Sequence, residues 1–372
     1  MTTMAIDNKD KKVLNVPHLR FPEFSGEWEN TELQYIAPNI CSGKDKPTSN
    51  GTVALYGSTG IIGMTRLASY NEEIVLVARV GANAGQLQIT TIPCGVTDNT
   101  LIINAKEWNR YIYYYLQHYN LNRLVFGSGQ PLITGSMLKK LKIIYGEESE
   151  RNKIVNLLCL LDERIATQNK IIEDLKKLKS AIIDQLYSAI KGKGYSYRQI
   201  FEIVNERNKQ LEYSNILSAS QEKGMVNRED LNLDIQFERS NINTYKVVRK
   251  GDYVIHLRSF QGGYAFSDKI GVCSPAYTIL RPNDLLEFRY LSYYFTSQKF
   301  IKSLIIVTYG IRDGRSINVE EWLDMKTTIP QKEQQRHIVD TIRNIEKKIE
   351  NEELYASYLS KQKQYLLRQL FI

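Results

Sequence analysis

The chain has 372 residues, of which 42% are hydrophobic and 24% are charged, and its formal net charge is +8. This length accommodates about two or three domains with real cores, and the composition is ordinary for a soluble globular protein. No apolar run is long enough to span a membrane and the N-terminus lacks a signal peptide's apolar stretch, so we expect a cytoplasmic protein without membrane contact. The positive charge suits a polyanionic partner.

The cysteines and histidines do not form a site. The four cysteines (Cys41, Cys94, Cys159 and Cys273) lie far apart, without the paired spacing of zinc or redox sites. The four histidines are equally scattered. We therefore expect free thiols and no bound metal.

After an N-terminal tail of residues 1–17, residues 18–148 have the pattern of a mixed helix and strand domain. Trp28, Leu33 and Ile36 have helical spacing. The elements predicted next are a buried strand at 74–79 that ends in Arg79, a Gly-bearing loop at 80–85, a strand at 99–103, an aromatic helix at 111–118 and a polar loop at 126–130. The tyrosines of the helix point in several directions, which favours packing over base stacking.

Residues 149–193 predict one long helix with a narrow apolar stripe, which Gly192 and Gly194 are expected to end. The apolar residues recur in steps of four and three, the period with which two helices wrap around each other. The predicted pairing residues are Ile154, Leu158, Leu161, Ile165, Ile172, Leu175, Ile182 and Leu186.

The domain pattern returns in residues 194–333, and the helix pattern returns in residues 334–372. The predicted elements are helical spacing at 195–203, a strand at 253–258, a Gly-bearing loop at 259–263, a strand at 276–280, an aromatic helix at 290–297 and a polar loop at 309–316. The pairing residues of the second helix are Ile338, Ile342, Ile345, Ile349, Leu359, Leu366 and Leu370.

Residues 154–187 and 338–371 align without a gap, so the chain contains an internal duplication far longer than a solenoid repeat. Even the polar interruptions of the stripe coincide, as Lys179 does with Lys363. Each helix would be about 50–60 Å long at about 1.5 Å per residue, and we expect the two to pack on each other. The alternative is that each helix is buried only on its own domain.

Three segments carry a resemblance to a known family. Residues 17–28 resemble the start of the specificity subunits of type I restriction–modification systems. Residues 329–339 resemble that family's junction between a recognition domain and a conserved helix, and residues 362–371 resemble its C-terminal segment. The first junction, residues 145–151, departs from the pattern because it lacks the usual proline and Glu-Gln pair.

The resemblance implies an α+β fold with two similar target-recognition domains, residues 18–148 and 194–333, separated by two long antiparallel coiled-coil helices in a pseudo-twofold internal repeat. It implies a non-catalytic DNA-binding subunit in which each domain reads one half of a bipartite, asymmetric site on double-stranded DNA. The paired helices would act as spacer and as docking surface for two modification subunits. Those subunits would carry the adenine methyltransferase chemistry and bind S-adenosylmethionine, and restriction subunits would join through the complex.

The residues themselves are consistent with a chain that has no catalytic centre, cofactor or metal. The nearest match to a base-methylating motif, residues 274–277, lacks the second proline and an upstream glycine-rich cofactor loop. Residues 57–63 are rich in glycine but lack phosphate-binding spacing, and no Gly-Lys-Ser/Thr sequence occurs, which argues against a nucleotide-driven motor.

We expect DNA contacts from loop residues. Arg, Gln and Asn can make paired hydrogen bonds to purine edges, whereas Ser, Lys and Tyr more often contact phosphates. The candidates in the first half are Lys44, Lys46, Ser58, Arg79, Asn83, Ser128 and Gln130. Those in the second half are Ser220, Lys223, Arg258, Gln261, Tyr309, Arg312 and Arg315.

Two other functions fit the same features: a stand-alone DNA-binding protein without an enzyme partner, and a coiled-coil adaptor whose halves bind other proteins. A neighbouring gene for an adenine methyltransferase would argue against the first. DNA binding that weakens with added salt would argue against the second.

Overall fold

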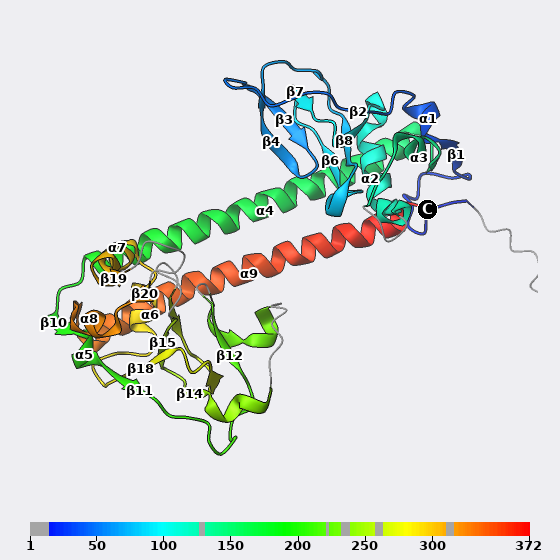
Figure 1. Ribbon diagram of the computed structural model, residues 1–372. Coiled ribbons are helices and arrows are strands. Elements are labelled where there is room, and N and C mark those ends of the chain that lie inside the picture. Colours follow the sequence, from blue (N-terminus) through cyan, green and yellow to red (C-terminus); the bar gives the residue numbers. More distant parts are fainter. Residues whose placement is uncertain (1–14, 126–130, 221–222, 232–238, 257–262, 310–315) are drawn as a thin grey trace, which may run out of the picture. The chain divides into compact units, whose positions relative to one another are not determined.

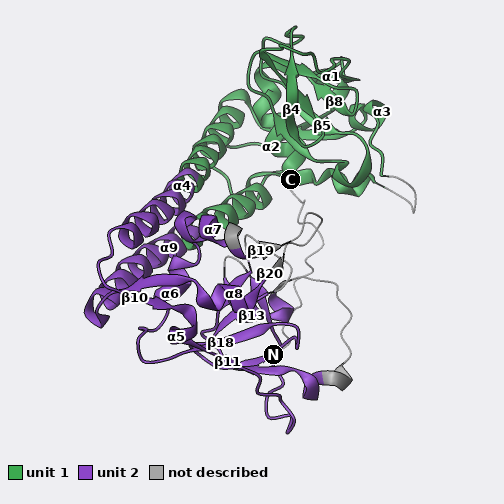
Figure 2. Ribbon diagram, turned by 60° about the vertical axis from the view of Figure 1, so that its left-hand side comes forward, with its two compact units in different colours: residues 1–169, 354–372 green, residues 170–353 purple. Residues whose placement is uncertain are grey.

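The computed structural model describes residues 15–125, 131–220, 223–231, 239–256, 263–309 and 316–372 (Figure 1). They form a mixed helix and strand fold with two long helices that pack together, α4 (Glu148–Ser188) and α9 (Lys332–Leu370). The chain divides into unit 1, residues 1–169 with 354–372, and unit 2, residues 170–353 (Figure 2). Each unit therefore contains one end of α4 and one end of α9.

Unit 1 is built around a four-stranded antiparallel sheet in the order β2-β8-β5-β6. Because successive side chains of a strand point to opposite faces, Val75 and Val77 enter one core while Leu76 enters another. Both faces are thus buried, which explains why the central strands are continuous apolar runs. The four strands are β2 (Cys41–Ser42), β8 (Thr100–Ile103), β5 (Val75–Ala78) and β6 (Leu87–Ile89).

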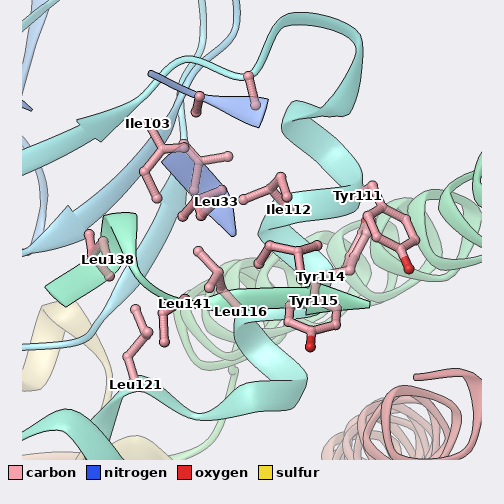
Figure 3. Close-up of a cluster of buried hydrophobic side chains, with 14 of the residues drawn as sticks. Leu33, Ile103, Tyr111, Ile112, Tyr114, Tyr115, Leu116, Leu121, Leu138 and Leu141 are labelled. Atoms are coloured by element: carbon pink, nitrogen blue, oxygen red, sulfur yellow. The ribbon is translucent and has the colours of Figure 1, made fainter. Parts of the chain in front are cut away.

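One face of this sheet packs against α2 (Asn109–Tyr119) in the core shown in Figure 3. Tyr111 and Tyr115 are buried there, and their hydroxyl groups donate to the carbonyl oxygens of Ile144 and Lys142 at 2.8 and 3.0 Å. These tyrosines therefore serve packing, as the sequence predicts.

The other face packs against a second sheet in the order β4-β3-β7, whose Tyr56 and Val96 are buried with Leu76. Here β3 (Val53–Gly57) pairs antiparallel with β4 (Gly60–Thr65) and parallel with β7 (Cys94–Val96). The remaining elements of unit 1 are the antiparallel pair β1 (Glu29–Glu32) and β9 (Lys142–Tyr145), the helices α1 (Leu33–Ile36) and α3 (Gly135–Lys139), and the 3-10 turns η1 (Gly81–Asn83), η2 (Lys106–Trp108) and η3 (Leu121–Leu124).

Unit 2 contains a four-stranded antiparallel sheet in the order β11-β18-β15-β16. Tyr253 and Ile255 enter one core and Val254 enters another, the same alternation as in unit 1. The strands of this sheet are β11 (Phe201–Val204), β18 (Thr278–Pro282), β15 (Tyr253–Ile255) and β16 (Tyr264–Phe266).

The other elements of unit 2 flank this sheet. The paired strands are β10 (Lys193–Ser196) with β21 (Lys326–Ile329), β12 (Leu217–Ser220) with β13 (Gly224–Asn227), β14 (Lys246–Val248) with β17 (Gly271–Cys273), and β19 (Thr308–Tyr309) with β20 (Ser316–Ile317). The helices and turns are α5 (Tyr197–Ile200), α6 (Tyr290–Tyr294), α7 (Gln298–Ser303), α8 (Val319–Asp324), η4 (Arg228–Leu231), η5 (Arg239–Thr244) and η6 (Leu304–Val307).

The residues predicted to pair the long helices are all buried or half-buried. Ile154 and Leu158 in unit 1, like Ile338 and Ile342 in unit 2, are at most 2% exposed. The buried residues outside the predicted set include Ile183 and Tyr187 of α4, Leu367 of α9, and Phe371, which directly follows α9. Within the described ranges, no helix is long and apolar enough to cross a membrane.

Three local predictions were wrong. Helix α4 ends at Ser188, before Gly192. A side chain at Gly192 would overlap the carbonyl group of Ile329, so this glycine allows β21 to approach closely and does not end the helix. The helical spacing after Trp28 yields strand β1 and a single turn α1, because pairing of β1 with β9 overrides the local pattern. The helical spacing at 195–203 likewise yields strand β10, a single turn α5 and strand β11, because the two strands pair with β21 and β18.

Candidate nucleic-acid interface

The turn of the β3–β4 hairpin in unit 1 is held against strand β6. The side-chain amide of Gln88 donates through Nε2 to the carbonyl oxygens of Gly57 and Ser58 at 3.0 and 3.1 Å. The hydroxyl of Ser58 donates to the carbonyl oxygen of Asn99 at 3.2 Å, and the backbone N–H of Arg79 donates to the same oxygen at 3.0 Å. The structure thus brings together Ser58 and Arg79, both predicted DNA contacts.

Two buried polar atoms around this turn have no partner among the described residues. They are the donor Nε of Arg79 and the acceptor Oε1 of Gln88. A buried polar atom without a hydrogen bond costs free energy, so such atoms are uncommon in folded proteins. Because both atoms are buried, they lie beneath the surface that a DNA base could reach.

Lys44 and Lys46 lie on an exposed loop, residues 43–50, which we call the lysine loop. The residue between them, Asp45, fixes its position: one carboxylate oxygen accepts from the backbone N–H of Val96 at 2.8 Å and the other from the hydroxyl of Ser69 at 2.6 Å. The two lysines are exposed on either side of this anchor, as contacts to a phosphate backbone require.

Asn83 lies in η1, on the connection from β5 to β6 that follows Arg79. The candidates Ser128 and Gln130 lie outside the described residues. The chain that follows them returns to this connection, because Gly81 donates its N–H to the carbonyl oxygen of Pro131 at 3.0 Å. The first-half candidates on described residues therefore belong to two loops and one hairpin turn of unit 1.

In unit 2, Ser220 and Lys223 lie at the turn of the β12–β13 hairpin, where the N–H of Lys223 donates to the hydroxyl of Ser220 at 3.3 Å. The hairpin packs closely on β16, since a side chain at Gly224 would overlap the carbonyl group of Phe266. Tyr309 lies in strand β19. The candidates Arg258, Gln261, Arg312 and Arg315 lie outside the described residues.

Each unit contains a tyrosine, a carboxylate and a lysine that join its domain to both long helices. In unit 1, the hydroxyl of Tyr114 donates to Asp162 of α4 at 2.9 Å, and Lys363 of α9 lies 2.6 Å from the same carboxylate. Burial raises the pKa of Tyr114, and its hydrogen bonds with Cys159 and Asp162 raise it further.

The arrangement in unit 2 uses the same residue types. The hydroxyl of Tyr293 donates to Glu346 of α9 at 2.7 Å, and Lys179 of α4 donates to the same carboxylate at 3.1 Å. Burial and the bond to Glu346 raise the pKa of Tyr293. In the aligned sequence copies, Asp162 matches Glu346 and Lys179 matches Lys363, so one polar interruption of the stripe, the lysine, forms an ion pair between the helices in both units.

The opening segment also holds the helix ends of unit 1. Arg20 donates through Nε and Nη2 to the two carboxylate oxygens of Glu150, at 2.8 and 2.9 Å, and the indole N–H of Trp28 donates to the same fully buried group at 3.0 Å. The N–H of Leu19 donates to the carbonyl oxygen of Gln369 at 2.9 Å. At the second junction, Gln335 is the buried polar anchor, with hydrogen bonds to Pro330, Leu285 and Glu287.

Sequence reasoning missed Gln88 and Asn99, which position the hairpin turn. A glutamine in the middle of the apolar strand β6 was the available signal, because a polar side chain at such a position needs a specific partner. Among the described residues, no group of three His, Cys, Asp or Glu side chains is placed to hold a metal ion.

Comparison with known proteins adds a family and a fold. Residues 12–177 match the family model of the type I restriction modification DNA specificity domain, which confirms the predicted resemblance over that segment. No curated protein sequence matches the chain.

Two solved structures resemble nearly all of the chain. The S subunit of a type I restriction-modification system from M. genitalium is 16% identical, with a TM-score of 0.58 over 96% of this chain and 99% of its own. The second is a chain from a structure that describes the complex assembly and conformational transition of the type I R-M system. It is 15% identical, with a TM-score of 0.58 over 92% of this chain and 97% of its own. At these identities the likeness establishes the fold.

Proposed function

We propose that this chain is the sequence-specific DNA-binding specificity subunit of a type I restriction–modification enzyme. One observation carries the proposal: residues 12–177 match the DNA specificity domain of that family. The similarity in fold to an S subunit over 96% of the chain supports extending the assignment beyond those residues. The chain then recognises DNA in the cytoplasm and leaves methylation and cleavage to its partners.

Each target-recognition domain, residues 18–148 and residues 194–333, reads one half of a bipartite, asymmetric site. Two features support a pseudo-twofold repeat of domain and helix. The sheets β2-β8-β5-β6 and β11-β18-β15-β16 have the same order of strands along the chain. The contacts of Tyr114 with Asp162 and Lys363 are matched by those of Tyr293 with Glu346 and Lys179. Since the hairpins and loops differ between the units, the two half-sites differ in sequence.

The paired helices α4 and α9 form an antiparallel coiled coil that acts as the spacer between the half-sites. In unit 2 the ion pairs between the helices follow an antiparallel order, with Lys176 bound to Glu353 at 2.6 Å and Lys179 bound to Glu346 at 3.1 Å. The duplicated helices also present two similar docking surfaces, so one chain binds two modification subunits. Those subunits hold S-adenosylmethionine, and restriction subunits join through the complex.

Mass measurement of the complex tests this assignment. The chain is co-expressed with an adenine methyltransferase subunit encoded beside it, and the intact complex is weighed by native mass spectrometry. We expect two partner subunits per chain and S-adenosylmethionine binding by the complex only. A one-to-one complex, or tight S-adenosylmethionine binding by this chain alone, would contradict the proposal.

DNA binding separates the two alternative functions. The complex should bind one DNA sequence in preference to others, and affinity should fall steeply with added salt because phosphate contacts release counterions. A chain that binds DNA specifically but never binds a methyltransferase would be a stand-alone DNA-binding protein. A chain that binds partners without any affinity for DNA would be an adaptor.

A further inference from the structure

The β3–β4 hairpin of unit 1 exposes several large apolar side chains. Ile61, Ile62 and Met64 of β4 are 56%, 53% and 49% exposed, and Leu67, which follows the strand, is 76% exposed. A single exposed apolar residue needs no explanation, whereas several close together in the chain indicate a contact surface. Ile61 and Met64 pair with Tyr56 and Ala54, so they lie on one face of the ribbon, and Ile62 lies on the other.

Ile62 lies on the face of the hairpin that the lysine loop covers. The pairing register shifts between Leu55 and Tyr56, which makes Ile62 the extra residue of β4. Its side chain folds over Gly57, where an added Cβ would lie 2.9 Å from it. Gly57 shares a face with Leu55 and its partner Gly63, and a Cβ at Gly63 would lie 3.9 Å from Pro47 of the lysine loop.

The charges beside this apolar turn are basic. From residue 43 to residue 67 the charged residues are Lys44, Asp45, Lys46 and Arg66. The lysines and Arg66 are exposed, whereas the carboxylate of Asp45 is occupied by Val96 and Ser69. Arg66 donates to the carbonyl oxygen of Ser49, and the side chains of the two lysines are exposed. An apolar group beside these cations complements a duplex, whose phosphates border the apolar methyl groups of thymine in the major groove.

The polar group of the turn itself is the hydroxyl of Ser58, which donates to the carbonyl oxygen of Asn99 and can still accept a hydrogen bond. An A·T pair presents a donor, two acceptors and the thymine methyl group side by side in the major groove. The major groove also admits a two-stranded β-ribbon such as β3–β4.

We propose that the β3–β4 hairpin enters the major groove of the half-site that unit 1 reads, and that Ile62 contacts a thymine methyl group. This inference rests on the proposed function and names chemistry that determines its specificity. The β12–β13 hairpin of unit 2 has no exposed large apolar side chain among its described residues. The thymine methyl contact is therefore assigned to the half-site that unit 1 reads.

The test removes the methyl group from the DNA and the apolar side chain from the protein. Duplexes carrying the recognised motif are made with deoxyuridine in place of thymidine, one position at a time, in both half-sites. Their affinities for the complex of this chain with its modification subunits are measured for the unaltered protein, for Ile61→Ala and for Ile62→Ala. Ile270→Ala is the matched control, since Ile270 is 47% exposed in unit 2.

We expect deoxyuridine at one position of a single half-site to weaken binding about fourfold, the effect of losing one buried methyl contact. In the Ile62→Ala complex this discrimination should fall to about onefold. Ile61→Ala should leave it unchanged, because Ile61 pairs with Tyr56 on the opposite face of the ribbon. The Ile270→Ala complex should discriminate as the unaltered protein does. Because Ile62 is half exposed, its truncation should leave the melting temperature unchanged.

Three results would overturn the inference while leaving the proposed function intact. One is specific binding that is insensitive to deoxyuridine at every thymidine of the motif. Another is full discrimination by the Ile62→Ala complex. The third is loss of modification subunits from that variant without any change in DNA preference, which would make the hairpin a protein contact. A complex without any sequence preference would overturn the proposed function as well.

Discussion

Asp162 should stabilise the helix pair through its two partners in unit 1. Lys363 lies 2.6 Å from the carboxylate, and the two side chains are 17% and 34% exposed. An exposed ion pair contributes about 0.2–1 kcal/mol, whereas a hydrogen bond to a charged group contributes about 1.5–3 kcal/mol. Since this pair is partly shielded from solvent, we expect a coupling free energy of about 1 kcal/mol between Asp162 and Lys363.

A double-mutant cycle measures this coupling. Asp162→Asn, Lys363→Met and the double variant are unfolded in urea, with helix content followed by circular dichroism. The pair Lys179 and Glu346 in unit 2 should give a similar coupling, because its side chains are 31% and 26% exposed.

The exposed pair Lys176 and Glu353 is the control. Its charged atoms are 2.6 Å apart, but its side chains are 57% and 47% exposed, so its coupling should be below about 0.3 kcal/mol. The coupling free energy of the control pair could equal those of the two shielded pairs, or the shielded pairs could show no coupling. In either case burial and the tyrosine hydrogen bond would not strengthen these ion pairs, and the two units would not share a matched stabilising contact.

Three further predictions address positioning, spacing and pH. Lys44→Ala or Lys46→Ala should weaken binding to all DNA sequences similarly and should make the affinity depend less steeply on salt concentration. Arg312→Ala or Arg315→Ala should instead relax the sequence preference in one half-site, at a cost of about 1–3 kcal/mol per base contact. An equal loss of affinity for all sequences in all four variants would refute the reading role of the arginines. Deletion of residues 166–172 together with 350–356 removes one heptad from each helix, about 10 Å at 1.5 Å per residue, and should shorten the spacer by about three base pairs of about 3.4 Å each without changing either half-site. An active deletion variant that keeps its original spacer would show that the helices do not set the distance. Burial raises the pKa of Tyr111 and Tyr187 well above the ordinary value of 10.0. These phenols therefore ionise near pH 10.0 only in the unfolded chain. Their contribution to the free energy of unfolding is complete below pH 10.0 and should be lost as the pH rises toward the raised pKa values. Urea unfolding at increasing alkaline pH checks this, and a free energy of unfolding that stays constant above pH 10.0 would contradict it.

The sequence predicted the long helices and their buried stripe because an apolar period of 3.5 has one structural solution. It also predicted the central strands β5 and β15, which are short apolar runs between turn residues. It did not predict strand β1, whose partner β9 lies more than a hundred residues away. Local spacing carries no information about such long-range pairing.

The candidate site was predictable only in part for a related reason. The loops were identifiable from glycine and polar residues, and the structure brings Ser58 and Arg79 to one turn. The contribution of Gln88 depends on strand β6 lying beside the β3–β4 hairpin, and that of Ile62 depends on the shifted register of its strand. Neither arrangement is encoded in the residues next to the one concerned.

In the proposed function, two different domains of this chain select one split DNA site. The most direct test is methylome sequencing of a host that expresses the chain with its modification subunit, compared with a host that expresses the modification subunit alone. We predict one new adenine-methylated motif that consists of two specified, non-palindromic parts separated by a fixed unspecified spacer. A single continuous motif, a palindromic motif, or no methylation that depends on this chain would contradict the account.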